Sequence, residues 1–338
     1  MSDLPVVGIT MGDPSGVGPE IIIKALSGSD IFKICRPLVL GDPSALFMNI
    51  EESTKMTIKE VSCPSDIEGK LGQINLLALS RLDNDLLQPG KPTVEGGKAM
   101  VDYIIRAVEM ARLGEISAMV TCPISKILMH QAGYDFNGHT QMLAHLTNTD
   151  DYVMMLAGSR LRVVPVTTHC AFKEVLANLD ENKILKAIFI TSDALNKDFG
   201  IKRPRLAVAA INPHAGEEGL FGSEEIKIIK PAIEKARSEG IEVEGPLAAD
   251  TLFYRAASGE FDAVVAMYHD QGLIPLKLLH FSDAVNITLG LPIIRTSVDH
   301  GTAYDIAGKG IADSSSLKAA ITMAVKMAEN RTKRRTRT

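Results

Sequence analysis

The chain has 338 residues, of which 46% are hydrophobic and 23% charged, and its formal net charge is −5 at pH 7. This length suits one large or two modest domains, and the acidic balance argues against a general nucleic-acid binder. No apolar run reaches the roughly 18 residues of a membrane-spanning helix, so no membrane association is expected.

The first residues, MSDLPVVGITMGD, pass from an acidic polar step directly into an apolar run. They lack the basic start and the long hydrophobic region of a secretory signal peptide. The cysteines show no C-x-x-C spacing, which is typical of reduced thiols rather than of a disulfide framework. We therefore expect a cytoplasmic protein. The cysteines are Cys35, Cys63, Cys122 and Cys170.

Apolar runs rich in Val, Ile and Ala predict buried strands, and each run ends in a polar or Gly/Pro-containing step. They lie at 6–13, 37–42, 117–123, 161–169, 205–214, 262–270 and 286–296. Amphipathic stretches of helical length lie at 93–114, 181–200, 223–240 and 316–330. Strands that are apolar on both faces and alternate with helices predict an α/β fold.

A glycine-rich turn connects the first strand to an apolar helix in TMGDPSGVGPEIIIKAL. Gly12, Gly16 and Gly18 permit a tight turn, and the N-terminus of a helix favours an anion. A strand-to-helix connection without a ligand explains the same residues.

Three histidines end three separate apolar runs, VVPVTTH, AVAAINPH and VVAMYHD. They are His169, His214 and His269. Ligands of α/β sheets bind at the carboxyl ends of strands, so we expect these imidazoles to converge. Three neutral imidazoles with an open coordination position suit a catalytic divalent metal, zinc first, with magnesium or cobalt as alternatives. Without a local H-x-x-x-H pair, each histidine is equally explained as a hydrogen-bonded residue at a strand end.

Charged and polar residues cluster in the sequence around these histidines. Asp270 follows His269, Lys277 lies in the same segment, and Asn286 and Arg295 flank the next apolar run. A lysine, an asparagine and an arginine near one cleft suit a phosphate or a carboxylate. Taken singly, each is also explained as a surface charge or a turn residue.

A small, polar, glycine-rich loop, TSVDHGTAYDIAGKG, follows the last apolar run at 296–310. It does not fit G-x-G-x-x-G, a pattern that occurs nowhere in the chain. Its glycines would let the backbone approach a ligand closely, although a plain loop is the alternative.

Together these motifs resemble the 4-hydroxythreonine-4-phosphate dehydrogenase family of pyridoxal phosphate synthesis, which includes a branch acting on D-threonate or D-erythronate 4-phosphate. The resemblance rests on GDPSGVGPE, GHT, TTH, NPHAG, ADT, MYHDQG and VNITLGLPIIRTSVDHGTA, and runs from about Val7 to Met327. HGTAYDIAGKG is similar to the nucleotide loop of the wider isocitrate/isopropylmalate dehydrogenase group. The implied fold has two α/β domains around a cleft, distinct from the Rossmann fold, in an obligate homodimer.

The resemblance also implies roles for individual residues. The metal ligands would be His169, His214 and His269, with one ligand supplied by the partner subunit. The substrate contacts would be His139, Thr140, Lys277, Asn286 and Arg295. The supporting carboxylates would be Asp250 and Asp270, and Asp270 and Lys277 are the candidates for proton transfer. The adenosine pocket would be lined by Gly301, Thr302, Ala303 and Asp305.

The chemistry that the resemblance implies is oxidation of a secondary alcohol by NAD, assisted by a divalent metal, followed by loss of CO2. NADP is the alternative cofactor, with Lys309 as the cation of the loop. The substrate carries either an amino group (4-hydroxy-L-threonine 4-phosphate) or a hydroxyl group (the D-threonate branch) at C2. A zinc hydrolase and a phosphate acyltransferase are the competing classes.

The expected domains are a nucleotide-side domain of residues 1–125 plus 290–330 and a metal, substrate and dimerisation domain of residues 126–289. Residues 331–338 carry five basic side chains, Arg331, Lys333, Arg334, Arg335 and Arg337. We expect this segment to be a disordered, solvated end, with a nucleic-acid or membrane tether as the alternative.

Overall fold

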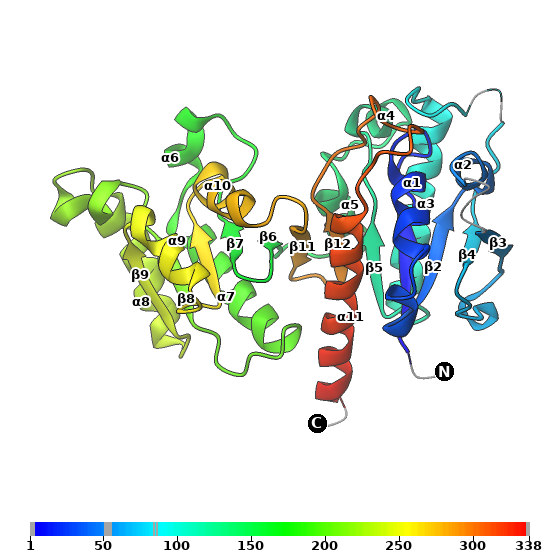
Figure 1. Ribbon diagram of the computed structural model, residues 1–338. Helices are drawn as coiled ribbons and strands as arrows, with labels where there is room; N and C mark the ends of the chain where they lie inside the picture. Colours follow the sequence, from blue (N-terminus) through cyan, green and yellow to red (C-terminus); the bar gives the residue numbers. More distant parts are fainter. Residues whose placement is uncertain (1–3, 51–55, 84, 86, 336–338) are drawn as a thin grey trace. The chain divides into compact units, whose positions relative to one another are not determined.

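The computed structural model describes residues 4–50, 56–83, 85 and 87–335, and the chain divides into two compact units (Figure 1). Unit 1 comprises Met1–Asp150 and Leu291–Glu329. Unit 2 comprises Asp151–Gly290 and Asn330–Thr338. Each unit is therefore assembled from segments that lie far apart in the sequence.

Unit 1 contains a parallel sheet with the strand order β3-β4-β2-β1-β5-β12. The strands are β1 (Val6–Thr10), β2 (Arg36–Gly41), β3 (Thr57–Glu60), β4 (Gln73–Ala78), β5 (Ala118–Thr121) and β12 (Arg295–Val298). The helices are α1 (Gly18–Leu26), α2 (Pro43–Phe47), α3 (Val94–Leu113), α4 (Lys126–Gln131), α5 (His139–Leu146) and α11 (Ser315–Arg335), the last of which ends in the segment assigned to unit 2.

The long helix α3 shows how local sequence signals set an element of unit 1. The Thr93 side chain accepts a hydrogen bond from the Gly96 backbone N–H at 3.1 Å and caps the start of the helix. Gly114 adopts a left-handed conformation with φ of 74° and ends it. The buried face of α3 packs against β1, β2 and β5.

Unit 2 contains a mixed sheet with the strand order β11-β6-β7-β10-β8-β9. Strands β7, β10, β8 and β9 are parallel, whereas β6 runs antiparallel to both β7 and β11. The strands are β6 (Val153–Ala157), β7 (Arg162–Pro165), β8 (Leu206–Ala209), β9 (Val243–Leu247), β10 (Ala263–Ala266) and β11 (Val285–Leu289). The helices are α6 (Val175–Asn178), α7 (Glu181–Lys197), α8 (Lys230–Ser238), α9 (Ala249–Ala257) and α10 (His269–Leu279).

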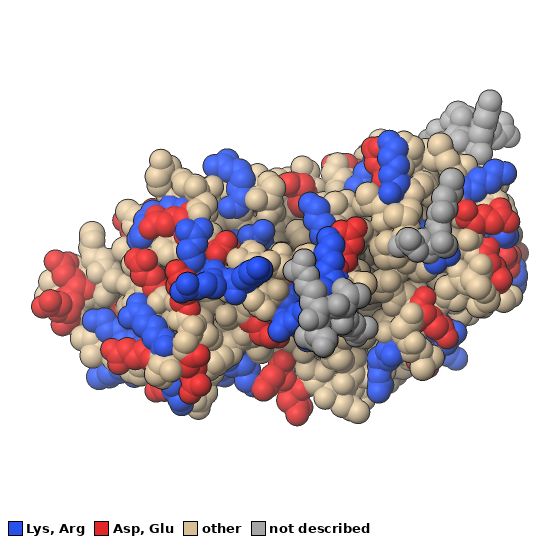
Figure 2. Space-filling model, turned by 90° about the horizontal axis from the view of Figure 1, so that it is seen from below, with Lys and Arg blue, Asp and Glu red and all other residues tan. Residues whose placement is uncertain are grey.

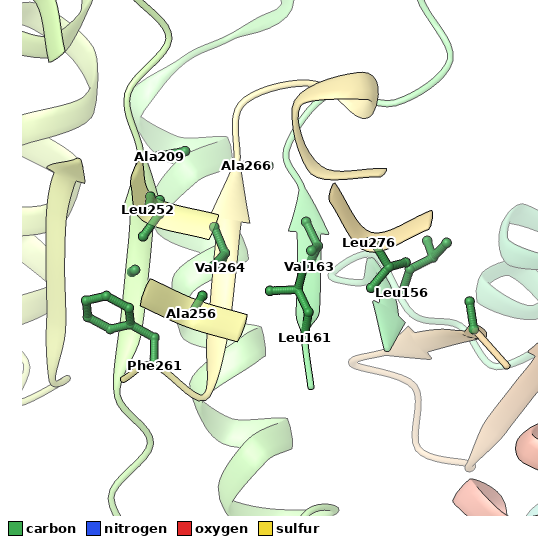
Figure 3. Packing of buried hydrophobic residues seen from close by; sticks show 12 residues of the cluster. Leu156, Leu161, Val163, Ala209, Leu252, Ala256, Phe261, Val264, Ala266 and Leu276 are labelled. Atoms are coloured by element: carbon green, nitrogen blue, oxygen red, sulfur yellow. The ribbon is translucent and has the colours of Figure 1, made fainter. Parts of the chain in front are cut away.

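The core of unit 2 forms where helices α9 and α10 pack on the sheet (Figure 3). Leu252 of α9 and Leu276 of α10 are fully buried members of this cluster, which also includes strand residues such as Val163. Helix α10 approaches the sheet closely at Gly272, where an added Cβ would lie 2.3 Å from a side-chain carbon of Val163. This packing fixes the helix that begins at His269.

The predicted α/β architecture is confirmed, because every apolar run contains a buried strand. The last run, 286–296, contains parts of two strands, β11 and β12, which belong to different units. Strands β3, β4, β6 and β9 were missed. Two of them, β3 and β9, are partly exposed edge strands with polar residues (TIKE and VEGPL), so they show no apolar run. The helical stretch 223–240 is also irregular, with a π-helical turn at Glu225–Ile229 before α8.

Two expectations about chain organisation differ from the structure. Residues 126–150, expected in the second domain, pack with unit 1 through contacts of α4 and α5 with α3. The basic end, expected to be disordered, continues α11 as helix through Arg335, whereas residues 336–338 lie outside the described residues. Arg331 explains this order, because its guanidinium donates to the Asp198 carboxylate at 2.5 and 3.0 Å.

Candidate active site

The three strand-end histidines follow three adjacent strands of unit 2. His169 follows β7, His269 follows β10 and His214 follows β8. These strands are parallel neighbours in the order β7-β10-β8. Their carboxyl ends therefore lie at one edge of the sheet, where ligands of α/β proteins bind.

Hydrogen bonds tie these three strand ends together. The Thr167 hydroxyl donates to the Met267 backbone carbonyl at 2.8 Å, which joins the ends of β7 and β10. The Gln271 side chain accepts from the Met267 backbone N–H at 2.7 Å and donates to the Ala210 backbone carbonyl at 2.6 Å, which joins β10 to β8. Sequence reasoning missed Gln271, although it stands in the MYHDQG segment. The backbone that carries the histidines is thus held in place.

His169 and His269 lie side by side, with ring centroids 5.9 Å apart. The Asp270 carboxylate is 2.7 Å from Nδ1 of His269. A carboxylate on one ring nitrogen directs the other, here Nε2, toward a metal, which is the usual arrangement around histidine ligands. The contact with Asp270 therefore restrains the orientation of the His269 ring.

His214 is exposed and lies on a turn with left-handed backbone, with its ring 6.0 Å from the ring of Phe221. Within the part of the chain that the structure describes, no three His, Cys, Asp or Glu side chains are grouped so that they could hold a metal ion. The site of three histidines therefore stays a prediction.

The remaining candidate residues of unit 2 are distributed over three elements. Asp250 is exposed in the first turn of α9, and this helix contacts the segment Pro213–Gly219. Lys277 lies on α10 with its Nζ 5.7 Å from the centroid of the Phe281 ring. Asn286, on β11, donates from Nδ2 to the Met154 sulfur at 3.4 Å.

In unit 1, the buried guanidinium of Arg295 places a positive charge that acts on His139. The Arg295 guanidinium is buried and donates to the Thr121 hydroxyl at 3.2 and 2.8 Å. Burial lowers the pKa of Arg295 to about 9, so the side chain stays protonated at neutral pH. Burial, and next the charge of Arg295, lower the pKa of His139 well below its usual range. The Nε2 atom of His139 is buried without a hydrogen-bond partner among the described residues. An anion that accepts hydrogen bonds fits here.

Thr140 lies with His139 in the first turn of α5, and the preceding Gly138 has φ of 130°. An added Cβ at Gly138 would lie 3.3 Å from Cε of Lys126 in α4. Lys126 therefore adds a second cation near the start of α5. Sequence reasoning missed it, because only the fold brings α4 beside α5.

The loop 301–310 packs on the glycine-rich turn near the N-terminus. The Val17 backbone N–H donates to the Thr302 carbonyl at 3.0 Å, and the Tyr304 hydroxyl donates to the Asp13 carboxylate at 2.6 Å. An added Cβ at Gly16 would lie 3.1 Å from the Thr302 carbonyl oxygen. The close contact between the two loops therefore explains why position 16 is glycine. This contact needs no ligand and agrees with the interpretation of the turn as a plain strand-to-helix connection.

The far end of the same loop is fixed by α1. The buried Glu20 carboxylate accepts from the Ala312 backbone N–H at 2.7 Å, and Lys24 donates to the Ala312 carbonyl at 2.7 Å. Gly301, just before the first of these anchors, and Asp305, between them, are exposed. An added Cβ at Gly301 would meet no atom within 4 Å, so the backbone there is open to a cofactor.

Ala303, also in this loop, has a positive φ of 43°. Its neighbour Tyr304 and the buried Asp13 were not singled out from the sequence. Burial raises the pKa of Asp13, whereas hydrogen bonds from Tyr304 and from the Ser15 backbone N–H lower it. The loop thus depends on a hydrogen bond to a buried carboxyl group.

Lys, Arg, Asp and Glu side chains are intermixed on the face drawn in Figure 2. This distribution agrees with the negative net charge in giving no support to nucleic-acid binding. A membrane-spanning helix is likewise missing from the described part of the chain, since none there combines the necessary length and apolarity.

Comparison with known proteins identifies the relatives of this chain. Residues 33–324 match the family model "Pyridoxal phosphate biosynthetic protein PdxA". A 4-hydroxythreonine-4-phosphate dehydrogenase of Desulforapulum autotrophicum is 56% identical over 95% of this chain and 94% of its own. A D-threonate 4-phosphate dehydrogenase of Cupriavidus necator is 47% identical over 98% of this chain and 100% of its own.

Among solved structures, the crystal structure of a 4-hydroxythreonine-4-phosphate dehydrogenase from Klebsiella pneumoniae is similar over 96% of this chain and 98% of its own. Its TM-score is 0.90 and its sequence identity 42%. Fold and relatives together define an α/β oxidoreductase, not a hydrolase or an acyltransferase. The chain belongs to the PdxA family, and as a member of a dehydrogenase family it uses a nicotinamide-type cofactor.

Proposed function

We propose that this protein oxidises and decarboxylates 4-hydroxy-L-threonine 4-phosphate to 3-amino-2-oxopropyl phosphate and CO2, with NAD and a divalent metal. The observation that carries the proposal is the position of His169, His269 and His214 after three adjacent parallel strands. Relatives that are named as dehydrogenases of this substrate support it.

His169, His214 and His269 would hold the metal, with one ligand supplied by a second subunit, and zinc suits three imidazoles best. When bound, the metal supplies Lewis-acid chemistry at the substrate alcohol, and NAD accepts the hydride. Asp270 keeps the His269 ring in the tautomer that presents Nε2.

We assign substrate contacts to His139, Thr140, Lys277, Asn286 and Arg295. The unpartnered Nε2 of His139 and the buried guanidinium of Arg295 support an anion site. A guanidinium recognises phosphate or carboxylate through two parallel hydrogen bonds.

Proton transfer is assigned to Lys277 rather than to Asp270. The carboxylate of Asp270 is already engaged with His269, which favours an orienting role. Lys277 lies on the same helix, α10, and its ammonium can exchange a proton with the reacting group. Asp250, in the first turn of α9, is the second supporting carboxylate.

The adenosine part of the cofactor is assigned to Gly301, Thr302, Ala303 and Asp305. The open backbone at Gly301 and the fixed ends of the loop support this assignment. We propose NAD, with NADP as the alternative, because the 2′-phosphate of NADP needs a nearby cation and residues 301–310 contain a single lysine or arginine, Lys309.

A homodimer is proposed because unit 2 exposes large apolar side chains around α10. The exposed fractions of Leu278 and Phe281 are 81% and 83%, and that of Ile274 is 58%. Contiguous exposed apolar side chains mark protein interfaces. A second subunit that covers this face would also supply the one of the three histidine ligands that we assign to the partner.

D-threonate or D-erythronate 4-phosphate, giving dihydroxyacetone phosphate and CO2, is the second candidate substrate. The Cupriavidus necator relative, at 47% identity, favours it. The two substrate classes differ by an amino or a hydroxyl group at C2.

The test measures NADH at 340 nm with purified protein, NAD and Zn²⁺, Mg²⁺ or Co²⁺, with each candidate phosphate in turn. We expect turnover with 4-hydroxy-L-threonine 4-phosphate. A higher kcat/KM with a D-threonate-type substrate would instead identify that compound as the substrate. No NADH with any substrate and metal would refute the oxidation. His214→Ala should abolish turnover in a folded dimer, whereas the exposed control His130→Ala should retain it.

A further inference from the structure

The segment that carries His214 has an unusual backbone. Five successive residues, His214–Glu218, have positive φ angles of 53°, 53°, 78°, 42° and 55°, and one of the five is glycine. Left-handed backbone is disfavoured for residues with a Cβ and occurs as single residues rather than runs. Such a turn persists only where its surroundings hold it, which is characteristic of functional sites.

The buried carboxylate of Glu225 holds the start of this turn. Its Oε1 accepts hydrogen bonds from the backbone N–H groups of Ile211 and Asn212 at 2.9 and 2.8 Å. Its Oε2 accepts from Nδ2 of Asn212 at 2.9 Å. The exposed fraction of Glu225 is 1%. A buried carboxylate with three donors from two consecutive residues fixes the direction in which the chain enters the turn.

The same carboxylate also lies against the middle of the turn. An added Cβ at Gly216 would lie 2.6 Å from Oε2 of Glu225, so this position requires glycine while the carboxylate is in place. Glu224 adds a further acceptor, at 2.7 Å from Nδ2 of Asn212. Glu225 itself begins a π-helical turn, a distortion that is frequent at functional sites.

His214, Glu217 and Glu218 are exposed, so the hydrophobic core does not require the strained conformation. We propose that Glu225, together with Asn212, is a positioning residue that holds the left-handed turn and thereby presents His214 to the metal. This inference rests on the proposed function, in which His214 is a metal ligand. In this proposal neither Glu225 nor Asn212 is a metal ligand.

Glu225→Gln tests the proposal. The glutamine oxygen can still accept hydrogen bonds from the two backbone N–H groups. Its amide N–H₂ group, however, faces Nδ2 of Asn212, so two hydrogen-bond donors meet and the third hydrogen bond is lost. We expect the Kd for Zn²⁺, measured by competition with a chelating dye, to rise about 10- to 100-fold. The Co²⁺ absorption spectrum should also change. NADH binding, measured by cofactor fluorescence, should stay unchanged because the loop 301–310 is not altered.

Glu234→Gln is the matched control, since it removes the same charge from an exposed position on α8. Its Kd for Zn²⁺ should equal that of the wild type. If Glu225→Gln does not fold, Asn212→Ala replaces it, because that variant keeps both backbone hydrogen bonds to Glu225. It should weaken Zn²⁺ binding by a smaller factor at a melting temperature near that of the wild type.

Two results would overturn the proposal in distinguishable ways. Unchanged Zn²⁺ affinity in a folded Glu225→Gln or Asn212→Ala variant, with weakened affinity in His214→Ala, rejects the positioning role and leaves the proposed function intact. Unchanged affinity in His214→Ala removes His214 from the metal site, and both the ligand set and the positioning role then fail.

Discussion

Replacing Tyr304 by phenylalanine removes the hydroxyl that donates to Asp13 at 2.6 Å. Asp13 is fully buried, so its carboxylate would keep the Ser15 N–H as a donor but lose the stronger O–H···O contact. A hydrogen bond to a charged group contributes about 1.5–3 kcal/mol. In a domain of this size each kcal/mol corresponds to roughly 2–4 °C in melting temperature.

The effect of Tyr304→Phe should depend on pH in a definite direction. Burial raises the pKa of Asp13 in the folded protein, and the Tyr304 hydrogen bond lowers it, so the variant raises this pKa further. A raised folded-state pKa means that stability is present at acid pH and is lost as pH rises through that pKa. The melting temperature of the variant should therefore approach that of the wild type near pH 4 and fall progressively below it toward pH 8.

Calorimetric melting curves between pH 4 and pH 8 measure this difference, with Tyr134→Phe as the control. The Tyr134 hydroxyl makes no hydrogen bond within the described residues. If loop 301–310 binds the cofactor as proposed, losing the hydroxyl that fixes this loop should also raise the KM for NAD more than it lowers kcat. The reasoning is refuted if Tyr304→Phe and the wild type have the same melting temperature. It is also refuted if their melting temperatures differ by the same amount at pH 4 and at pH 8.

Three further variants test other contacts. Arg295→Met should raise the KM for the phosphorylated substrate about 10- to 100-fold and leave NADH binding unchanged, because about 1.5–3 kcal/mol of charged hydrogen bonding is lost. Arg295→Lys should recover part of the lost affinity for the substrate. Arg331→Ala leaves the Asp198 carboxylate, 5% exposed, without its guanidinium and should lower the free energy of unfolding by about 1.5–3 kcal/mol in denaturant titrations. Gly18→Ala places a Cβ 2.0 Å from the backbone carbonyl oxygen of Met11 and should lower the free energy of unfolding by at least about 1–3 kcal/mol. Gly28→Ala, whose Cβ would meet no atom within 4 Å, should be close to neutral. An unchanged KM, an unchanged unfolding midpoint, or equal behaviour of the two glycine variants would contradict the respective argument.

Some features of the fold were predictable from local sequence and others were not. The buried strands β1, β5, β8 and β10 were predicted because they lie within a sheet, where both faces must be apolar. The edge strand β3 was missed because one side of it meets solvent and its residues are polar. The basic end was expected to be disordered because its charge composition alone does not show that Arg331 forms an ion pair with the buried Asp198.

The candidate site divides in the same way. The positions of His169, His214 and His269 after apolar runs could be read directly, because a strand end is a local property of the sequence. Lys126, Gln271 and Glu225 could not, because each acts on a segment that the fold alone brings close. Asp270 was expected to be a supporting carboxylate, but its contact with the His269 ring became visible only in the folded structure.

By itself, the sequence determined the α/β class, the strand-end histidines and the glycine-rich loop, since periodicity and residue type express local physical preferences. Tertiary structure decided how the chain divides into two units, what holds the loop 301–310 and what holds the turn of His214. These features depend on contacts between residues far apart along the chain, such as Tyr304 with Asp13, which no local pattern encodes. A hydrogen bond to a buried carboxylate forms only after the rest of the fold has excluded water from it.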